Sequence, residues 1–379
     1  MNSFNFNPVF VEQLKQKNIL TATNVQKTVI PIILQGKNII FQSDTGTGKT
    51  LAFLLPLIER HKLMTSENIV LIVSPTHELA SQIKNEANYF EGIKSILCFG
   101  GVPIKRQIEM LKTKPQVIVG SATRLSELIM LKKIKIQNVS AIVFDEVDRL
   151  LSKELREKSL QLLSLVYQNT NIQIIACSAT IKNDTEISLN KTFNKKDNIS
   201  LFEIIKLPSE NILTNKIKHI AIYAENCNKA DTLRSFLAAV QPKKTLVFTS
   251  RPQDAEILAS KLRNKKVNCE CLHAKADKIK RKSAIDKFRS GKSNLLITSD
   301  LAARGLDIAN ISHIIQMDLP KAEDFFIHRT GRTARCGKEG INVVIGDAFE
   351  MENFARLEKK LKIFVNPAEL HGGKLVFLK

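Results

Sequence analysis

A glycine-rich stretch is the part of this chain best suited to chemistry. Residues 43–50 read S-D-T-G-T-G-K-T, between the strand-like run 38–41 and an apolar helical run from Leu51. Such glycines let the backbone turn so that its N–H groups surround phosphate oxygens at a helix N-terminus. In this pattern Lys49 reaches the terminal phosphates and Thr50 ligates Mg²⁺. The predicted nucleotide-binding residues here are Thr45, Gly46, Thr47, Gly48, Lys49 and Thr50.

A pair of adjacent carboxylates supplies the second half of the predicted site. Asp145-Glu146-Val147-Asp148 follows the apolar run 139–144, which has strand character. We expect Asp145 to bind the metal and Glu146 to orient or deprotonate the attacking water. Taken singly, the glycine stretch is also compatible with an ordinary strand-to-helix turn, and the acidic stretch with a solvated helix cap. Their occurrence together, in this order and behind apolar strands, favours hydrolysis of a nucleoside triphosphate.

Length and composition indicate an enzyme of more than one domain. The chain has 379 residues, of which 44% are hydrophobic. This length exceeds what a single hydrophobic core usually organises. No apolar stretch approaches the ~18–20 residues that span a bilayer, and the N-terminus lacks a signal-peptide pattern, so we expect a cytoplasmic protein. The six cysteines form no C-x-x-C pair, which argues against a zinc site or a disulfide framework.

The strong positive charge predicts a polyanionic partner. The net charge is +20, with 26 basic against 19 acidic residues in 1–210 and 31 against 18 in 211–379. Nucleic acid and a membrane surface both fit such an excess. Because no basic amphipathic anchor is evident, nucleic acid is favoured, although a lysine-rich proteome would also raise the charge.

Short apolar strands alternate with helical stretches twice along the chain, which predicts an α/β fold with parallel sheets covered by helices. The first set of predicted strands comprises 69–73, 95–98, 117–119, 141–144 and 172–177. After 207–211 the pattern restarts with 216–223, 245–248, 268–272, 294–297, 313–317 and 341–345. We therefore expect a first domain over 1–209 and a second over 210–379.

Eight short motifs in order carry a family resemblance over nearly the whole chain. They are Gln26, the loop 43–50, P-T-H-E-L-A at 75–80, Gly100-Gly101, D-E-V-D at 145–148, S-A-T at 178–180, S-D-L-A-A-R-G-L-D at 299–307 and H-R-T-G-R-T-A-R at 328–335. On these residues the chain resembles a DEAD-box ATP-dependent RNA helicase of superfamily 2, with the variant box Asp-Glu-Val-Asp. The resemblance implies two RecA-like domains, each a mainly parallel sheet covered by helices on both faces. It also implies a flexible linker between them and ATP bound at their interface.

The resemblance also implies roles for individual residues at the nucleotide. Gln26 matches the glutamine that recognises adenine through its amide. Arg332 and Arg335 match arginines that stabilise charge on the transferring phosphoryl group and act with Lys49 in catalysis. The residues implied near the ribose are Gly305 and Asp307. The residues implied to couple hydrolysis to RNA binding are Asp148, Ser178, Thr180 and His328.

RNA contacts are implied at Pro75, Thr76, Gly101, Ser121, Arg124, Arg251, Ser299 and Asp300. Hydroxyls, backbone N–H groups and arginines suit phosphates and 2′-hydroxyls, which carry no base code. The chain departs from the family pattern at several of these motifs. His77 replaces Arg, Ser121-Ala122-Thr123-Arg124 replaces Thr-Pro-Gly-Arg, Lys278 replaces Gln, Ser299 replaces Thr, and Ala22 and Asn24 replace prolines. Met1 occupies the register of an aromatic residue, for which Phe4 and Phe6 are alternatives, unless Phe6 fills the core.

We therefore expect an RNA helicase that binds single-stranded RNA across two domains, hydrolyses ATP with Mg²⁺ and locally unwinds short duplexes. RNA recognition would be largely sequence-independent, because no separate recognition domain is evident. We expect a monomer, with ribosomal or RNA-decay proteins as candidate partners. Two alternatives stay open: an RNA clamp or chaperone that uses ATP as a timer, and a DNA-translocating motor. Duplex release separates the first from a helicase, and RNA-versus-DNA stimulation of ATPase separates the second.

Overall fold

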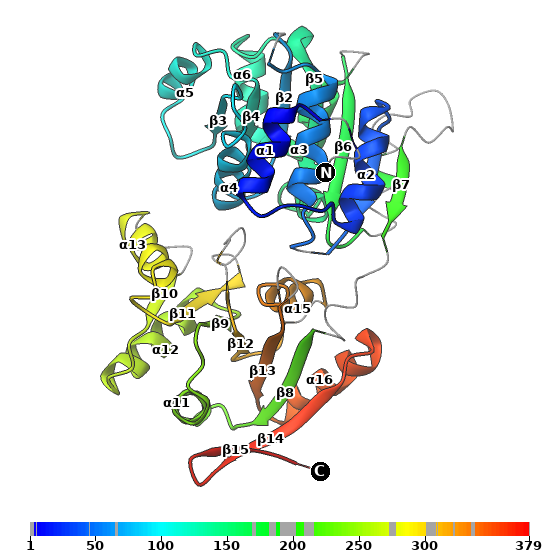
Figure 1. Ribbon diagram of the computed structural model, residues 1–379. Coiled ribbons are helices and arrows are strands. Elements are labelled where there is room, and N and C mark those ends of the chain that lie inside the picture. Colours follow the sequence, from blue (N-terminus) through cyan, green and yellow to red (C-terminus); the bar gives the residue numbers. More distant parts are fainter. Residues whose placement is uncertain are drawn as a thin grey trace. The chain divides into compact units, whose positions relative to one another are not determined.

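The computed structural model describes residues 4, 6–44, 46–64, 67–168, 172–181, 187–189, 202–207, 216–272, 278–300, 308, 310–320, 323–334 and 338–378, apart from the side chains of residues 278, 279 and 324. The chain divides into two compact units, Met1–Pro208 and Ser209–Lys379. Figure 1 shows the first unit in blue to green and the second in green to red. Each unit is built around one sheet.

The first unit is a parallel sheet of seven strands in the order β3-β4-β2-β5-β6-β1-β7. Its strands are β1 (Ile39–Gln42), β2 (Ile69–Val73), β3 (Ser95–Cys98), β4 (Val117–Gly120), β5 (Val139–Asp145), β6 (Gln173–Ser178) and β7 (Glu203–Lys206). Its helices are α1 (Pro8–Gln16), α2 (Asn24–Leu34), α3 (Lys49–Arg60), α4 (His77–Ala87), α5 (Ile104–Leu111), α6 (Ala122–Met130), α7 (Val147–Leu150) and α8 (Arg156–Val166), with a 3-10 turn η2 (Ile136–Asn138).

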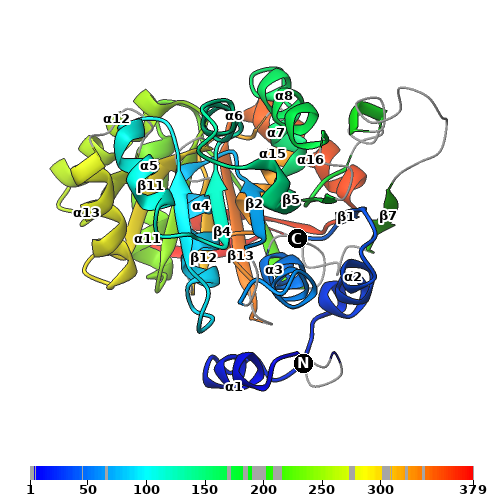
Figure 2. The same cartoon turned by 90° about the horizontal axis from the view of Figure 1, so that it is seen from above.

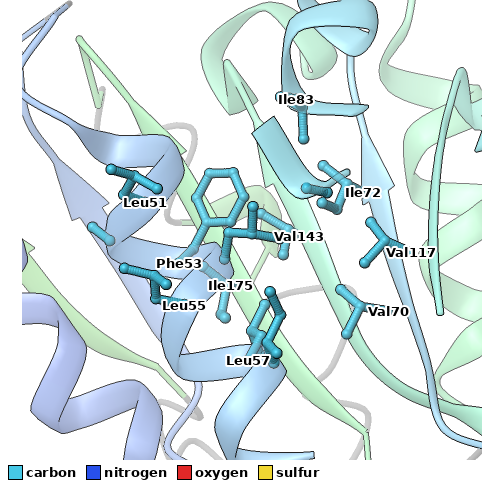
Figure 3. Packing of buried hydrophobic residues seen from close by; sticks show 14 of the residues in the cluster. Leu51, Phe53, Leu55, Leu57, Val70, Ile72, Ile83, Val117, Val143 and Ile175 are labelled. Atoms are coloured by element: carbon cyan, nitrogen blue, oxygen red, sulfur yellow. The ribbon is translucent and has the colours of Figure 1, made fainter. Parts of the chain in front are cut away.

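Alternation along the strands of the first unit sorts apolar side chains into two cores, one on each face of the sheet. In β2, Val70 and Ile72 enter one core while Leu71 and Val73 enter the other, as the period of two in a strand requires. The first core contains residues of α1 to α4, and Figure 3 shows α3 packed there against β2. The second contains residues of α6, α7 and α8, and Figure 2 shows α3 and α8 on opposite sides of β5. Helices therefore cover both faces.

This parallel arrangement brings the motifs of the first unit to one edge of its sheet. All strand pairs in the unit are parallel, so the carboxyl ends of the strands meet along the same edge. The loop 43–48 follows β1, and Asp145 ends β5. The segments with predicted RNA contacts follow β2, β3 and β4, which lie together in the strand order. The nucleotide motifs therefore lie on one half of the edge and the predicted RNA contacts on the other.

The second unit is a sheet of eight strands in the order β10-β11-β9-β12-β13-β8-β14-β15. Its strands are β8 (Ile217–Tyr223), β9 (Thr245–Thr249), β10 (Glu270–Leu272), β11 (Leu295–Ser299), β12 (His313–Gln316), β13 (Gly340–Gly346), β14 (Val365–His371) and β15 (Lys374–Phe377). Its helices are α11 (Lys229–Val240), α12 (Pro252–Asn264), α13 (Lys278–Arg289), α15 (Glu323–Thr330) and α16 (Ala348–Leu361). Leu246 and Val247, neighbours in β9, enter different cores, so this sheet is also covered on two faces.

The predicted α/β architecture with mainly parallel sheets is confirmed. Each predicted strand corresponds to an observed one, with ends that differ by a residue or two. Three strands were missed, namely β7 and the hairpin β14–β15, whose two strands form the antiparallel pair of the second sheet. Phe6 lies in the first core, in ring contact with Phe4 at 5.7 Å. Within the described ranges, no helix has both the length and the apolarity that crossing a membrane requires.

Candidate active site

The glycine-rich loop leads directly into α3. Gly48 is the N-cap of this helix and has φ +92°, a left-handed conformation that a residue with a Cβ adopts only under strain. Lys49 is the first helical residue, and its Nζ donates to the carbonyl oxygens of Ser43 (2.7 Å) and Asp44 (2.8 Å). The lysine ammonium is therefore folded back over the loop, where it can exchange carbonyl oxygens for phosphate oxygens.

The loop is braced by its own hydroxyl groups and by the neighbouring strand. The hydroxyls of Ser43 and Thr47 lie 2.7 Å apart, and Thr47 Oγ1 lies 2.8 Å from the Asp44 carbonyl oxygen. The backbone N–H of Ser43 donates to the Ser178 carbonyl (3.0 Å), which continues the pairing of β1 with β6. The start of the loop is thus fixed to the sheet before the glycines turn it.

Gln26 lies on α2 and is buried against the loop, with 1% of its surface exposed. Its Nε2 donates to the Gly48 carbonyl (3.2 Å), and its Oε1 accepts from the backbone N–H of Thr23 (3.0 Å). The amide therefore joins the start of α2 to the turn before α3. A Cβ on Gly48 would lie 2.6 Å from Gln26 Nε2, so the two residues leave each other no spare room.

The two carboxylates lie where β5 ends. Asp145 is the last residue of the strand and is buried, with 4% of its surface exposed. Glu146 is half-buried and has φ +53°, a conformation uncommon for a residue other than glycine. This turn begins α7 and directs the Glu146 N–H to Asp145 Oδ1 at 3.1 Å. The adjacent carboxylates therefore differ in burial, although they are neighbours in the sequence.

Electrostatic effects are strong around this pair. Burial, followed by repulsion from Glu146, raises the pKa of Asp145 to about 6. The Cys177 thiol, which donates to Asp145 Oδ1 at 3.1 Å, and the ammonium of Lys49 oppose that rise. Burial also lowers the pKa of Lys49 and raises that of the Cys177 thiol well above its usual range. The structure thus gathers one cation, two carboxylates and a thiol in a low-dielectric site.

A hydrogen-bonded link connects the acidic motif with S-A-T. The Thr180 hydroxyl donates to Asp148 Oδ2 at 2.9 Å, while Asp148 Oδ1 accepts from the backbone N–H of Arg149 (2.9 Å). The Thr180 N–H donates to the buried hydroxyl of Ser178 at 3.3 Å. Three residues assigned to coupling are therefore connected within the first unit.

The predicted RNA contacts of the first unit lie at helix starts and in a glycine turn. Thr76 caps α4 and Ser121 caps α6, through their hydroxyls, and Pro75 precedes the first of these caps. Gly101 has φ +76° and is exposed. Arg124 is largely covered, because its Nη1 donates to the Val102 carbonyl (3.1 Å) and its Nε pairs with Glu127 (2.9 Å). His77, which replaces the family's arginine, makes an edge contact with Phe99 at 5.5 Å.

In the second unit, the predicted contacts follow the paired strands β9 and β11. Arg251 is exposed after β9, whereas Ser299, at the end of β11, is buried. Both oxygens of Asp300 are bound by Arg329, from Nε at 2.6 Å and from Nη2 at 2.7 Å. Arg329 is 1% exposed and also donates to the Asp318 carbonyl (2.7 Å). Asp300 is therefore held in a fixed orientation.

The remaining predicted residues divide into those that the structure describes and those that it does not. Arg332 is buried two residues beyond the end of α15, and His328 is half-buried within that helix. Thr45, Gly305, Asp307 and Arg335 lie outside the described residues. Their assigned roles stay predictions.

Three residues that contact this machinery were missed from the sequence. Cys177 lies directly before Ser178, Arg329 directly after His328, and Gln107 seven residues after Gly100. Cys177 lies next to an assigned motif residue, and Arg329 lies within the motif 328–335 but received no role, which was the available signal. Gln107 had none, because its contacts depend on the packing of α5 against the glycine turn.

Comparisons with known proteins agree with this arrangement. A family model described as "DEAD/DEAH box helicase" matches residues 23–187, and one described as "Helicase conserved C-terminal domain" matches residues 228–337. The DEAD-box ATP-dependent RNA helicase CshC of Bacillus cereus is 35% identical over 376 residues, covering 98% of this chain and 94% of that protein.

Solved structures share the fold. Dbp5 of S. cerevisiae bound to RNA and ADP BeF3 has a TM-score of 0.86 at 24% identity, covering 97% of this chain and 95% of that one. Mss116p bound to ssRNA and AMP-PNP has a TM-score of 0.84 at 25% identity, covering 97% and 78%. With the motifs at one edge of a parallel sheet and relatives that match almost end to end, the chain belongs to the DEAD-box family of ATP-dependent RNA helicases.

Proposed function

We propose that this RNA helicase hydrolyses ATP with Mg²⁺, grips single-stranded RNA without base recognition, and unwinds short duplexes locally. The observation that carries this proposal is the convergence of Lys49, Asp145 and Glu146 beside a left-handed glycine at the start of α3. Lys49 would bind the terminal phosphates of the nucleotide. Glu146 would orient the attacking water and accept its proton.

The residues around Asp145 fit a magnesium ion chemically. Mg²⁺ prefers hard oxygen donors, and the Asp145 carboxylate and the Thr50 hydroxyl supply them in the first unit. When bound, the ion would neutralise charge on the phosphate oxygens. The buried position of Asp145 supports this role, because charge interactions are stronger where water is excluded.

Roles that depend on the second unit belong to the same proposal. Arg332 and Arg335 would stabilise the charge of the transferring phosphoryl group, and Gly305 and Asp307 would lie near the ribose. Gln26 would give preference for adenine, because an amide both donates and accepts hydrogen bonds. In exchange it would give up its present bond to the Gly48 carbonyl.

RNA as the partner is supported by the family and by the chemistry at the sheet edges. Helix caps, the turn at Gly101 and the exposed Arg251 present N–H groups, hydroxyls and a guanidinium, which recognise phosphates and 2′-hydroxyls. The Mss116p structure, which contains ssRNA, supports single-stranded RNA as the bound form. We further propose that the protein acts as a monomer in the cytoplasm, with ribosomal or RNA-decay proteins as partners to test.

Glu146→Gln tests the catalytic assignment. This change keeps the side-chain shape and leaves Asp145 intact, so Mg²⁺-ATP and RNA should still bind while turnover falls by at least about a hundredfold. Glu154→Gln, at an exposed position between α7 and α8, is the matched control and should behave as wild type. ATP hydrolysis by Glu146→Gln within about tenfold of wild type would show that Glu146 is not the base.

Duplex length tests the unwinding mode. Local bending can offset only the few base pairs that the protein covers, and each added step contributes ~1.4 kcal/mol of stacking. We expect RNA duplexes of about ten base pairs to separate readily and those above roughly twenty-five hardly at all. Strong ATPase stimulation without strand release would favour the RNA clamp. Efficient separation of long DNA duplexes would favour a translocating motor.

A further inference from the structure

The glycine turn 99–102 of the first unit is held by a buried side chain from α5. Gln107 has no exposed surface, and its Nε2 donates to the carbonyls of Phe99 (2.8 Å) and Val102 (3.0 Å). These carbonyls flank Gly100 and Gly101. One amide therefore binds the turn on both sides of its two glycines.

The turn gains from such support, because its two glycines have no side chains that could hold the backbone in place. Gly101 has φ +76°, and a Cβ built on Gly100 would meet no atom of the described residues within 4 Å, its two chain neighbours aside. Glycine also loses more conformational freedom on ordering than any other residue. Arg124 also donates a hydrogen bond to the Val102 carbonyl. Among the described side chains, it is Gln107 that donates to the Phe99 carbonyl.

The position of Gln107 also carries a cost that packing alone does not explain. Its Oε1 is buried and has no hydrogen-bond partner within the described part of the chain. A buried acceptor without a partner is destabilising, because it has lost its hydrogen bonds to water and gained none in return. An apolar side chain of similar length would avoid this cost, and would also lose both bonds to the turn.

We infer that Gln107 is a positioning residue for RNA binding, which fixes the Gly100-Gly101 turn so that its backbone can contact an RNA phosphate. This inference rests on the proposed function, because it takes the turn as an RNA contact. Without the two bonds the turn would sample more conformations, and RNA binding would have to restrict them. The effect should therefore fall on RNA affinity and not on the chemical step.

Gln107→Met tests the inference, because methionine keeps the length of the side chain and removes its donor. Gln173→Met is a matched control, since Gln173 is also buried in the first unit and donates to two backbone carbonyls, of Ile33 (3.0 Å) and Lys37 (2.9 Å). Both variants lose two hydrogen bonds to backbone carbonyls, and Gln173→Met also loses the contact of Gln173 Oε1 with His61 Nε2 at 3.1 Å. The glycine turn is contacted by Gln107 and not by Gln173.

Two measurements test the inference, namely the RNA concentration for half-maximal ATPase and hydrogen exchange in the glycine turn. We expect Gln107→Met to raise the RNA concentration for half-maximal ATPase at least about fivefold, with the rate at saturating RNA within about twofold of wild type. Hydrogen exchange should accelerate in residues 99–103. Gln173→Met should change neither the RNA half-saturation nor exchange in that segment.

Several outcomes would overturn the inference. They are an unchanged RNA half-saturation in Gln107→Met, an equal rise in Gln173→Met, and unchanged exchange at 99–103. Failure of the proposed function would look different, because wild-type ATPase itself would then not respond to RNA. Gly101→Ala provides a further separation: if it weakens RNA binding while Gln107→Met does not, the turn contacts RNA and Gln107 does not position it.

Discussion

Replacing Gly48 by alanine should destabilise the first unit through two separable effects. The residue has φ +92°, and a left-handed conformation costs an L-residue about 1–2 kcal/mol. The new Cβ would also lie 2.6 Å from Gln26 Nε2, which must move and give up its bond to the Gly48 carbonyl. That bond contributes about 0.5–1.5 kcal/mol. Displacing Gln26 also disturbs its bond to Thr23 at the start of α2.

The sum predicts a loss of about 1.5–3.5 kcal/mol in the free energy of unfolding of the first unit. For a unit of this size, that corresponds to a fall of roughly 3–14 °C in its Tm. Hydrogen exchange of β1 and β6 peptides in increasing urea would measure the free energy of unfolding of the first unit by itself. Nucleotide affinity should also fall, because the turn at Gly48 sets the direction of the loop N–H groups.

Gly92→Ala separates strain from collision. Gly92 lies in the same unit with φ +79°, and its nearest neighbour is the flexible end of Met64 at 2.9 Å. We therefore expect a loss of only about 1–2 kcal/mol. Gln26→Ala combined with Gly48→Ala should cost less than the sum of the single changes by about 1 kcal/mol, because the collision is removed. Equal losses in Gly48→Ala and Gly92→Ala, or strict additivity in the double variant, would refute this reasoning.

Three further predictions concern pH, coupling and salt. Burial lowers the pKa of His313 from 6.5 to about 4, so the unfolded chain binds a proton at a higher pH than the folded one. Stability should therefore fall by about 2–3 kcal/mol as pH drops from 6.5 toward 4, and His313→Gln should flatten this dependence in unfolding measurements. Thr180→Val removes the bond to Asp148 at 2.9 Å and should reduce duplex release more than ATP affinity, whereas equal reductions would argue against coupling. If the exposed Lys280 and Lys282 on α13 bind RNA phosphates, changing both to Gln should reduce the slope of log affinity against log salt by about 1.4, and an unchanged slope would make them a solvated helix face.

Local sequence patterns were sufficient to predict a motif wherever its chemistry depends on residues that are neighbours in the sequence. The glycine loop between a strand and a helix, and the carboxylates after an apolar strand, were predicted because φ requirements and hydrophobic alternation act over a few residues. The hairpin β14–β15 was missed because the prediction relied on such local patterns. Val365–His371 contains Pro367 and has only one buried residue, Ala368, so it lacks the apolar run that marked the predicted strands.

The sequence by itself determined the family, the α/β class and the order of the motifs along the chain. Only the tertiary structure decided which side chains support those motifs. Gln26 reaches Gly48, Cys177 reaches Asp145, and Gln107 holds both ends of a glycine turn. The contact between Cys177 and Asp145 depends on the pairing of β6 with β5, which brings together residues 32 positions apart in the chain. A buried polar group takes whichever partner packing places beside it, and no local pattern in the sequence records that partner.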